Sequence, residues 1–217
     1  QRGCTPDSDP NMTAEDAQRL LEEGKRYEKE SEWTIGKLLR APQVWKLGIA
    51  LGLMCLTISG ILTHLVAIFV ARGFTTTQGI AGMSVVSALA IPLSLLLGVL
   101  DSKKGAKTAT SVLAIVMAVC FFLSLIPTKF SVIFAALAAA ADMGCLNNVA
   151  TSLPASIFGR YDMKRAQSVI LPIMQVLQAI GVGLTGVIGD ATGGFDVVLA
   201  IMGCCSIVAL LVLRSLK

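Results

Sequence analysis

The sequence predicts an all-α membrane protein with six transmembrane helices. Hydrophobic residues make up 54% of the 217 residues and charged residues only 15%, whereas a soluble domain carries about 25% charged residues. The mean hydropathy is +0.75. The third observation is a series of six apolar runs, each near the length of about 20 residues that a helix needs to cross the hydrocarbon core.

The six runs and the polar breaks between them define the predicted organisation. The spans are expected at about 47–71, 79–100, 106–126, 130–153, 167–189 and 196–213. The breaks read RGFTTTQ, DSKKGAK, PTK, FGRYDMKRA and DATGGF. Residues 1–40 differ in kind, because they hold nine of the 14 acidic residues and few apolar ones. We therefore expect residues 41–217 to form the six-helix bundle and residues 1–40 a solvated cytoplasmic segment.

The basic residues predict the orientation in the membrane. Eleven of the 18 Lys and Arg residues lie beside one set of helix ends, whereas Arg72 and Lys129 alone lie beside the other set. The other five lie in the N-terminal tail, and none falls in the middle of a span. Because cytoplasmic loops carry the excess of Lys and Arg, both ends of this chain are expected in the cytoplasm of a multi-pass cell-membrane protein. The net charge of +4 is spread over several loops, which favours a lipid surface over nucleic acid as its partner.

Other motifs narrow the chemistry. The six cysteines contain no CxxC pair, so neither a disulfide framework nor a zinc site is predicted. The motif GVGLTG matches GxGxxG but lies in the middle of a span, where its glycines, like Gly48 and Gly52, are expected to allow another helix to approach closely. The spans contain no HExxH motif and no nucleophile–base pair. We therefore predict neither an enzyme nor a metal or cofactor site.

The break between the second and third spans resembles a known family. The stretch LLGVLDSKKGAKT is similar to the cytoplasmic loop motif of the major facilitator superfamily, which has a Gly, an Asp, a basic residue, a second Gly and further basic residues. The matching residues are Gly98, Asp101, Lys103, Lys104, Gly105 and Lys107. The spacing departs from the motif by one residue on each side of Asp101, and Ser102 replaces a basic residue.

Further stretches extend the resemblance over nearly the whole chain. SEWTIGKLLRAPQVWKLGIAL, THLVAIFVARGFT and GVIGDATGGFDVVLAI resemble the branch that holds oxalate/formate exchangers and monocarboxylate transporters. The resemblance implies the C-terminal half of a twelve-helix bundle, with the N-terminal six-helix half of the same polypeptide as its partner. It also implies secondary active transport of a small organic solute by alternating access, coupled to protons or to exchange.

The resemblance further implies which spans line the cavity, namely the first, second, fourth and fifth of this half. The candidate residues for the cavity or for proton coupling are the polar residues of these spans: Asp142, His64, Asn147, Asn148, Gln175 and Gln178. Gln175, Gln178 and Thr185 share one helix stripe. This stripe either lines the cavity or bonds to another helix.

His64 and Asp142 each leave two interpretations open. His64 is the only histidine, and it serves either proton coupling or a hydrogen-bonded outer gate. Asp142 and Asn147 are offset by about 140° around their helix at 100° per residue, so they do not point straight into one cavity together. Either Asn147, Asn148 and Thr151 line the cavity while Asp142 bonds to a neighbouring helix, or Asp142 faces the cavity and carries the coupling proton.

Alternative functions remain at this point. A non-transporting sensor or scaffold with the same fold would have the same sequence pattern. A channel is disfavoured because the spans contain no ring of like charges and no filter loop. The second and fifth spans contain no Lys or Arg. A carboxylate solute would therefore find no charge partner in these two spans and would need one from the N-terminal half.

Overall fold

The computed structural model describes residues 18–19, 22 and 34–216, and these residues form helices and turns without a strand. Within this part of the chain, six helical segments are long and apolar enough to cross a membrane. The predicted all-α membrane protein with six spans is confirmed. Most of the predicted cytoplasmic segment 1–40, including Cys4, lies outside the described residues.

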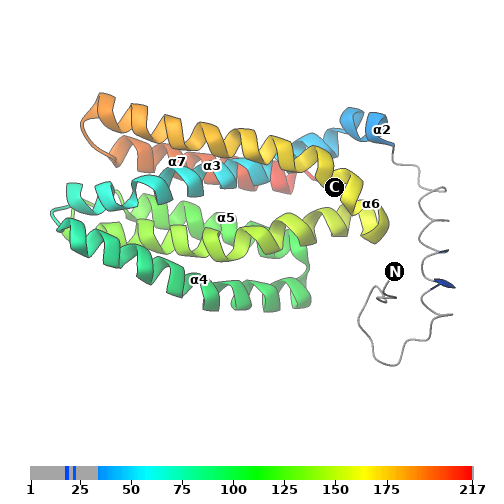
Figure 1. Ribbon diagram of the computed structural model, residues 1–217, viewed down its shortest axis with the longest axis horizontal. Helices are drawn as coiled ribbons and strands as arrows, with labels where there is room; N and C mark the ends of the chain where they lie inside the picture. The colour runs from blue at the N-terminus through cyan, green and yellow to red at the C-terminus, as the bar shows by residue number, and fades with distance from the viewer. Residues whose placement is uncertain (1–17, 20–21, 23–33, 217) are drawn as a thin grey trace, which may run out of the picture.

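The helices follow one another with short connections (Figure 1). They are α2 (Ile35–Arg40), α3 (Pro42–Ala71), α4 (Thr76–Lys104), α5 (Ala106–Leu123), the short 3₁₀ helix η1 (Lys129–Ser131), α6 (Val132–Thr192) and α7 (Asp196–Arg214). The long α6 contains two spans, which we call the first arm (Lys129–Gly159) and the second arm (Asp162–Thr192). In Figure 1 the first arm is yellow-green, and the second arm returns beside α7 in yellow and orange.

Two of the connections are shorter than the sequence predicted. In the predicted break FGRYDMKRA, only Gly159 leaves the helical conformation, with φ 78° and ψ 167°. In DSKKGAK, Gly105 alone separates α4 from α5, with φ 83°. Glycine lacks a Cβ atom and adopts positive φ without strain, so a single residue reverses the chain. The flanking charged residues continue the helices instead of forming loops.

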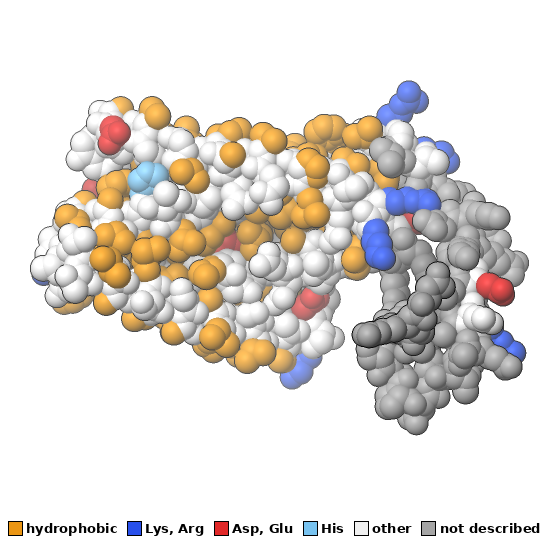
Figure 2. All heavy atoms as spheres, in the orientation of Figure 1, with side chains coloured by type: hydrophobic (Ala, Val, Ile, Leu, Met, Phe, Trp, Pro, Cys, Tyr) orange, Lys and Arg blue, Asp and Glu red, His pale blue; other side chains and the backbone are white. Residues whose placement is uncertain are grey.

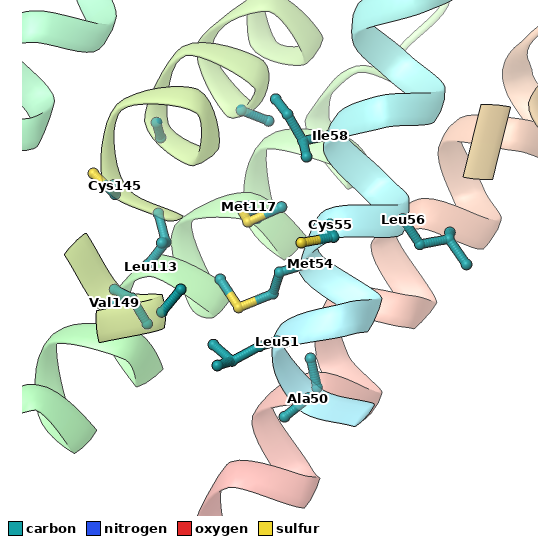
Figure 3. Close-up of a cluster of buried hydrophobic side chains, with 14 of the residues drawn as sticks. Ala50, Leu51, Met54, Cys55, Leu56, Ile58, Leu113, Met117, Cys145 and Val149 are labelled. Atoms are coloured by element: carbon teal, nitrogen blue, oxygen red, sulfur yellow. The ribbon is translucent and has the colours of Figure 1, made fainter. Parts of the chain in front are cut away.

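Helix α3 lies at the centre of the bundle. It packs against both arms of α6 and against α7, while α4 packs mainly on α6, and α5 packs on α7 and α6. The core that joins α3, α5 and the first arm is shown in Figure 3 and is formed by small and sulfur-containing side chains, among them Leu51, Met54, Cys55, Leu113, Met117, Cys145 and Val149. These side chains fill the space between helices that approach closely.

The two ends of the bundle are held by different bonds. At one end, Lys46 Nζ donates to the Ser215 carbonyl at 3.4 Å, and Lys107 Nζ donates to the Leu216 carbonyl. Both lysines thus bond carbonyl groups at the C-terminal end of α7, which carries a partial negative charge. At the opposite end, Arg72 pairs with Asp196 at the start of α7 and donates to the Ser124 carbonyl at 3.1 Å. Lys and Arg side chains gather at the first end in Figure 2.

Candidate functional site

Asp142 lies in the interior of the bundle. Its side chain is 0% exposed, and neither carboxylate oxygen has a hydrogen-bond partner. It shares a helix face with Cys145 and Val149, and Figure 3 shows both of these side chains among the core residues of α3 and α5. The thiols of Cys55 and Cys145 lie near the carboxyl group.

Asp142 has no basic side chain at its depth in the membrane. Each Lys and Arg in the six described spans lies within about five residues of a span end. An isolated ionised carboxylate in apolar surroundings is costly by several kcal/mol. In this conformation the neutral carboxylic acid is therefore the form that the surroundings favour.

The amides of the first arm point away from Asp142. Asn147 and Asn148 are both exposed. Asn148 Nδ2 donates to Ser94 Oγ at 2.9 Å, so it connects the first arm to α4. The exposed hydroxyl of Thr151 bonds to the carbonyls of Asn147 and Asn148 one turn earlier. Of the two arrangements that the sequence left open, the structure has Asn147 and Asn148 outward and Asp142 inward, but Asp142 makes no bond to a neighbouring helix.

The predicted stripe on the second arm divides between two environments. Gln175 is exposed, Gln178 is half-buried and Thr185 is fully buried. Thr185 Oγ1 donates to the carbonyl of Gly181 at 2.9 Å. Ser59 of α3, which the sequence did not single out, donates to the main-chain carbonyl of Gln178 at 2.7 Å. The stripe therefore includes both an outward amide and a helix–helix contact.

His64 lies apart from Asp142. Its Nδ1 is 3.1 Å from the Gly60 carbonyl on its own helix; in the tautomer with Nδ1–H, this nitrogen donates and Nε2 is left as an acceptor. The ring is half-buried beside the second arm and stands 6.2 Å from the Phe195 ring, centroid to centroid. His64 is nine residues along α3 from Cys55, which corresponds to about 13 Å at 1.5 Å per residue. The two titratable candidates are not brought together.

The loop motif forms a compact turn. Asp101 begins the last turn of α4, and its carbonyl accepts the Gly105 N–H at 2.8 Å. Its half-buried side chain makes no ion pair or hydrogen bond within the described residues. Gly98, Lys103 and Lys104 are exposed, and a Cβ atom on Gly98 would meet no neighbouring atom within 4 Å. The motif thus presents its polar side chains to the surroundings of the bundle.

The glycines of GVGLTG serve helix packing in part. A Cβ atom on Gly181 would collide with the main-chain carbonyl of Leu56 in α3. One on Gly186 would lie 3.4 Å from His64 Nε2. A Cβ atom on Gly183 would meet nothing within 4 Å. The expected close helix approach is confirmed at Gly181, and Gly48 and Gly52 do the same against Ile173 and Leu177.

Two hollows lie in the surface of the bundle. An apolar groove of about 430 Å³ runs between α4 and the first arm, lined by Phe69, Gln78, Ala81, Gly82, Val85, Val86, Leu89, Ile133, Ala136 and Leu137. A second hollow of about 310 Å³ lies at the lysine-rich end near Lys107. Neither is lined by a candidate cavity residue. Among the described residues, no group of three His, Cys, Asp or Glu side chains is placed to hold a metal ion.

A search against protein-family models and curated proteins gives no match to this chain.

Proposed function

We propose that this six-helix bundle is one half of an alternating-access transporter that moves a small organic solute across the cell membrane. The proposal depends on exposed amides in the middle of spans. Asn147 is 12 residues from the nearer end of the first arm and Gln175 is 13 residues from the nearer end of the second. These separations correspond to about 18–20 Å at 1.5 Å per residue, a depth at which lipid offers no hydrogen-bond partner.

A face that carries such amides is suited to water or protein. A second six-helix bundle facing α4 and the arms of α6 would enclose a polar cavity between the halves, where Asn147 and Gln175 would bind solute or water. The resemblance of the loop motif and its flanking helices to the major facilitator superfamily supports the same arrangement. Both ends of the described bundle would lie in the cytoplasm, beside the lysine-rich end.

The buried carboxyl of Asp142 supports proton coupling. It has no partner in this conformation, so it must gain water or a hydrogen-bond donor before it can ionise. A conformational change that opens the core between α3, α5 and the first arm would supply that water. Proton release from Asp142 and the change of access would then favour each other, as linkage requires.

The first test compares the 217-residue chain with the same chain joined to six preceding helices. Both are reconstituted in liposomes that contain a pH-sensitive dye and are offered a panel of small neutral solutes and organic acids. We expect solute-dependent proton flux from the joined protein and none from the 217-residue chain, because one wall of the cavity is missing. Equal flux from the two would contradict the proposed half. Absence of proton flux from both proteins with every solute of the panel would favour the sensor or scaffold.

The second test concerns coupling. In the joined protein, uptake is expected to rise as the external pH falls, because protonated Asp142 is the form stable in the closed core. Asp142→Asn is expected to remove this dependence while solute exchange continues. Asp190→Asn, which changes an exposed carboxyl at the opposite end from the lysines, serves as the control and should keep the pH profile. An Asp142→Asn profile that matches the unmodified protein would make Asp142 a packing residue only.

A third test concerns Asp101, whose side chain is unpaired within the described residues. We propose that it bonds to the partner half in one of the two access states. Asp101→Asn is then expected to lower the turnover rate more than it changes the solute concentration at half-maximal rate. Unchanged turnover would leave the loop with a role in topology alone.

A further inference from the structure

The corner where α2 meets α3 combines exposed apolar and basic side chains. Leu39 is 47% exposed and Trp45 is 45% exposed. Lys37 and Arg40, in the last turn of α2, are also exposed. Neither makes an ion pair or a side-chain hydrogen bond within the part of the chain that the structure describes. We call these four residues the α2 corner.

Contacts with the rest of the fold hold the α2 corner in place. Leu38, on the opposite side of α2, is 0% exposed and belongs to the hydrophobic core, and α2 packs against α6. Trp45 Nε1 donates to the Leu39 carbonyl at 2.7 Å. This bond brings the indole beside the α2 backbone and satisfies its only donor. Nearly half of the surface of each of Leu39 and Trp45 stays exposed.

The position of the corner along α3 places it at the membrane surface. Helix α3 has 30 residues, which corresponds to about 45 Å, whereas the hydrocarbon core is about 30 Å thick. The helix therefore extends beyond the hydrocarbon by about 15 Å in total. Trp45 is the fourth residue of α3 and directly precedes Lys46, the first charge of the span. Tryptophan in this position is typical of the boundary between acyl chains and headgroups.

We propose that the α2 corner binds anionic phospholipid, with Leu39 and Trp45 among the upper acyl chains and Lys37 and Arg40 on the headgroup phosphates. The charges match, because neither basic group is paired within the described residues and the described residues of α2 include no acid. Basic residues next to a membrane surface attract anionic lipid, and the guanidinium group suits a phosphate in particular. This site follows from the spanning fold and holds whether or not the protein transports a solute.

Quenching of Trp45 fluorescence by brominated lipids tests the proposal in the reconstituted protein. The emission of Trp45 is obtained as the difference between the unmodified protein and Trp45→Phe. Bromine at shallow acyl positions is expected to quench this emission more strongly than bromine at the chain ends. Brominated phosphatidylglycerol is expected to reach half-maximal quenching at roughly a fifth or less of the mole fraction that brominated phosphatidylcholine needs, since each of the two basic residues at the surface is worth about a fivefold preference.

Charge variants separate the site from general surface charge. Lys37→Gln with Arg40→Gln is expected to bring the two half-quenching fractions together. Lys103→Gln with Lys104→Gln removes the same charge from the same end of the bundle and should keep the preference. Absence of quenching by either lipid would show that protein covers the corner and would overturn the proposal. Equal loss in both double variants would also overturn it, as would displacement of the preference by soluble glycerol phosphate, which would indicate a site for a free anion.

Discussion

Helices α3 and α4 are similar in length and hydropathy but differ greatly in how much of their surface the fold buries. They have 30 and 29 residues, and their most apolar stretches have mean hydropathies of 2.2 and 2.3. Yet 56% of the residues in that stretch of α3 are buried, against 17% in α4. Lipid tails are as apolar as leucine, so hydropathy reports that a segment leaves water and does not report what it packs against.

The small residues of the two helices show where the difference arises. Gly48, Gly52 and Gly60 of α3 face side chains of the second arm or α7 at distances that leave no room for a Cβ atom. The closest such contact of α4 involves a glycine of the first arm, because a Cβ atom on Gly144 would collide with the Ala90 carbonyl of α4. Gly79 and Gly82, near the start of α4, also contact α3 closely. Backbones that approach closely along a whole helix bury it, whereas separate points of contact leave the rest of α4 exposed.

The largest expected effect breaks the close approach to α3. Gly181→Leu places a side chain against the main chain of Leu56, and we expect it to lower the free energy of unfolding by about 3 kcal/mol or to prevent assembly, because main chain cannot yield as a flexible side chain does. Gly183→Leu, two residues away, has open space and is expected to change stability little. Unfolding in mixed detergent measures both. Equal losses would show that this interface is not closely packed.

A smaller effect is expected from truncating one leucine in each helix. Leu51 of α3 is 0% exposed and Leu95 of α4 is 69% exposed. Leu51→Ala is expected to cost about 2 kcal/mol through lost packing, and Leu95→Ala less than about 0.5 kcal/mol. The same detergent unfolding series applies. A large loss for Leu95→Ala in the 217-residue chain would mean that α4 already packs on protein there.

The outer ends of α3 and α4 are held by different contacts. Substitution of Arg72 tests the contacts at the end of α3. Arg72 follows α3 and binds both the Ser124 carbonyl and Asp196, so Arg72→Gln is expected to cost about 1.5 kcal/mol. Lys129→Gln, which loses only the contact of its ammonium group with the Phe74 ring at 4.7 Å, is expected to cost about 0.5 kcal/mol. If the lysine variant proves the more damaging, the proposed role of Arg72 in joining three helix ends is wrong.

The smallest effect concerns the start of α4, which is fixed locally. The Thr75 side chain accepts the Gln78 N–H at 3.3 Å, and the Gln78 side chain accepts the Thr75 N–H at 2.9 Å. Thr75→Ala is expected to cost about 1 kcal/mol and to appear as faster amide exchange confined to the first turn of α4. Thr77→Ala is the control, because that exposed residue has no part in the cap. Faster exchange throughout α4 would show that the cap supports the whole helix.

The sequence predicted the spans closely and the connections less well. Each observed span contains or nearly coincides with a predicted one, because apolar runs of the required length have few other structures available. The break FGRYDMKRA was expected to be a loop, but charged residues at the membrane surface continue a helix at little cost. A single glycine, Gly159, was enough to reverse the chain.

The sequence predicted which residues are candidates for the site but did not predict how they are arranged in space. Helix geometry alone set Asp142 and Asn147 on different faces. The inward orientation of Asp142 came from packing between helices, which includes the close contact of Gly144 with Ala90 that joins α4 to the first arm. The bond from Ser59 to the Gln178 carbonyl had no signal in the sequence, since serine is common in membrane helices and a carbonyl acceptor exists at every residue.

The sequence was sufficient to predict that this protein crosses the membrane, the approximate position of each crossing, and that most of its basic residues lie at one end. These properties follow from the free energy of moving each segment out of water, which is a local sum over side chains. Packing between the helices, in contrast, set three other features. It placed α3 at the centre of the bundle and α4 at the periphery. It enclosed Asp142 without a partner, and it left Leu39 and Trp45 partly exposed beside Lys37 and Arg40. Those outcomes depend on shape complementarity between distant segments, and shape complementarity is a property of pairs of helices that no single segment contains.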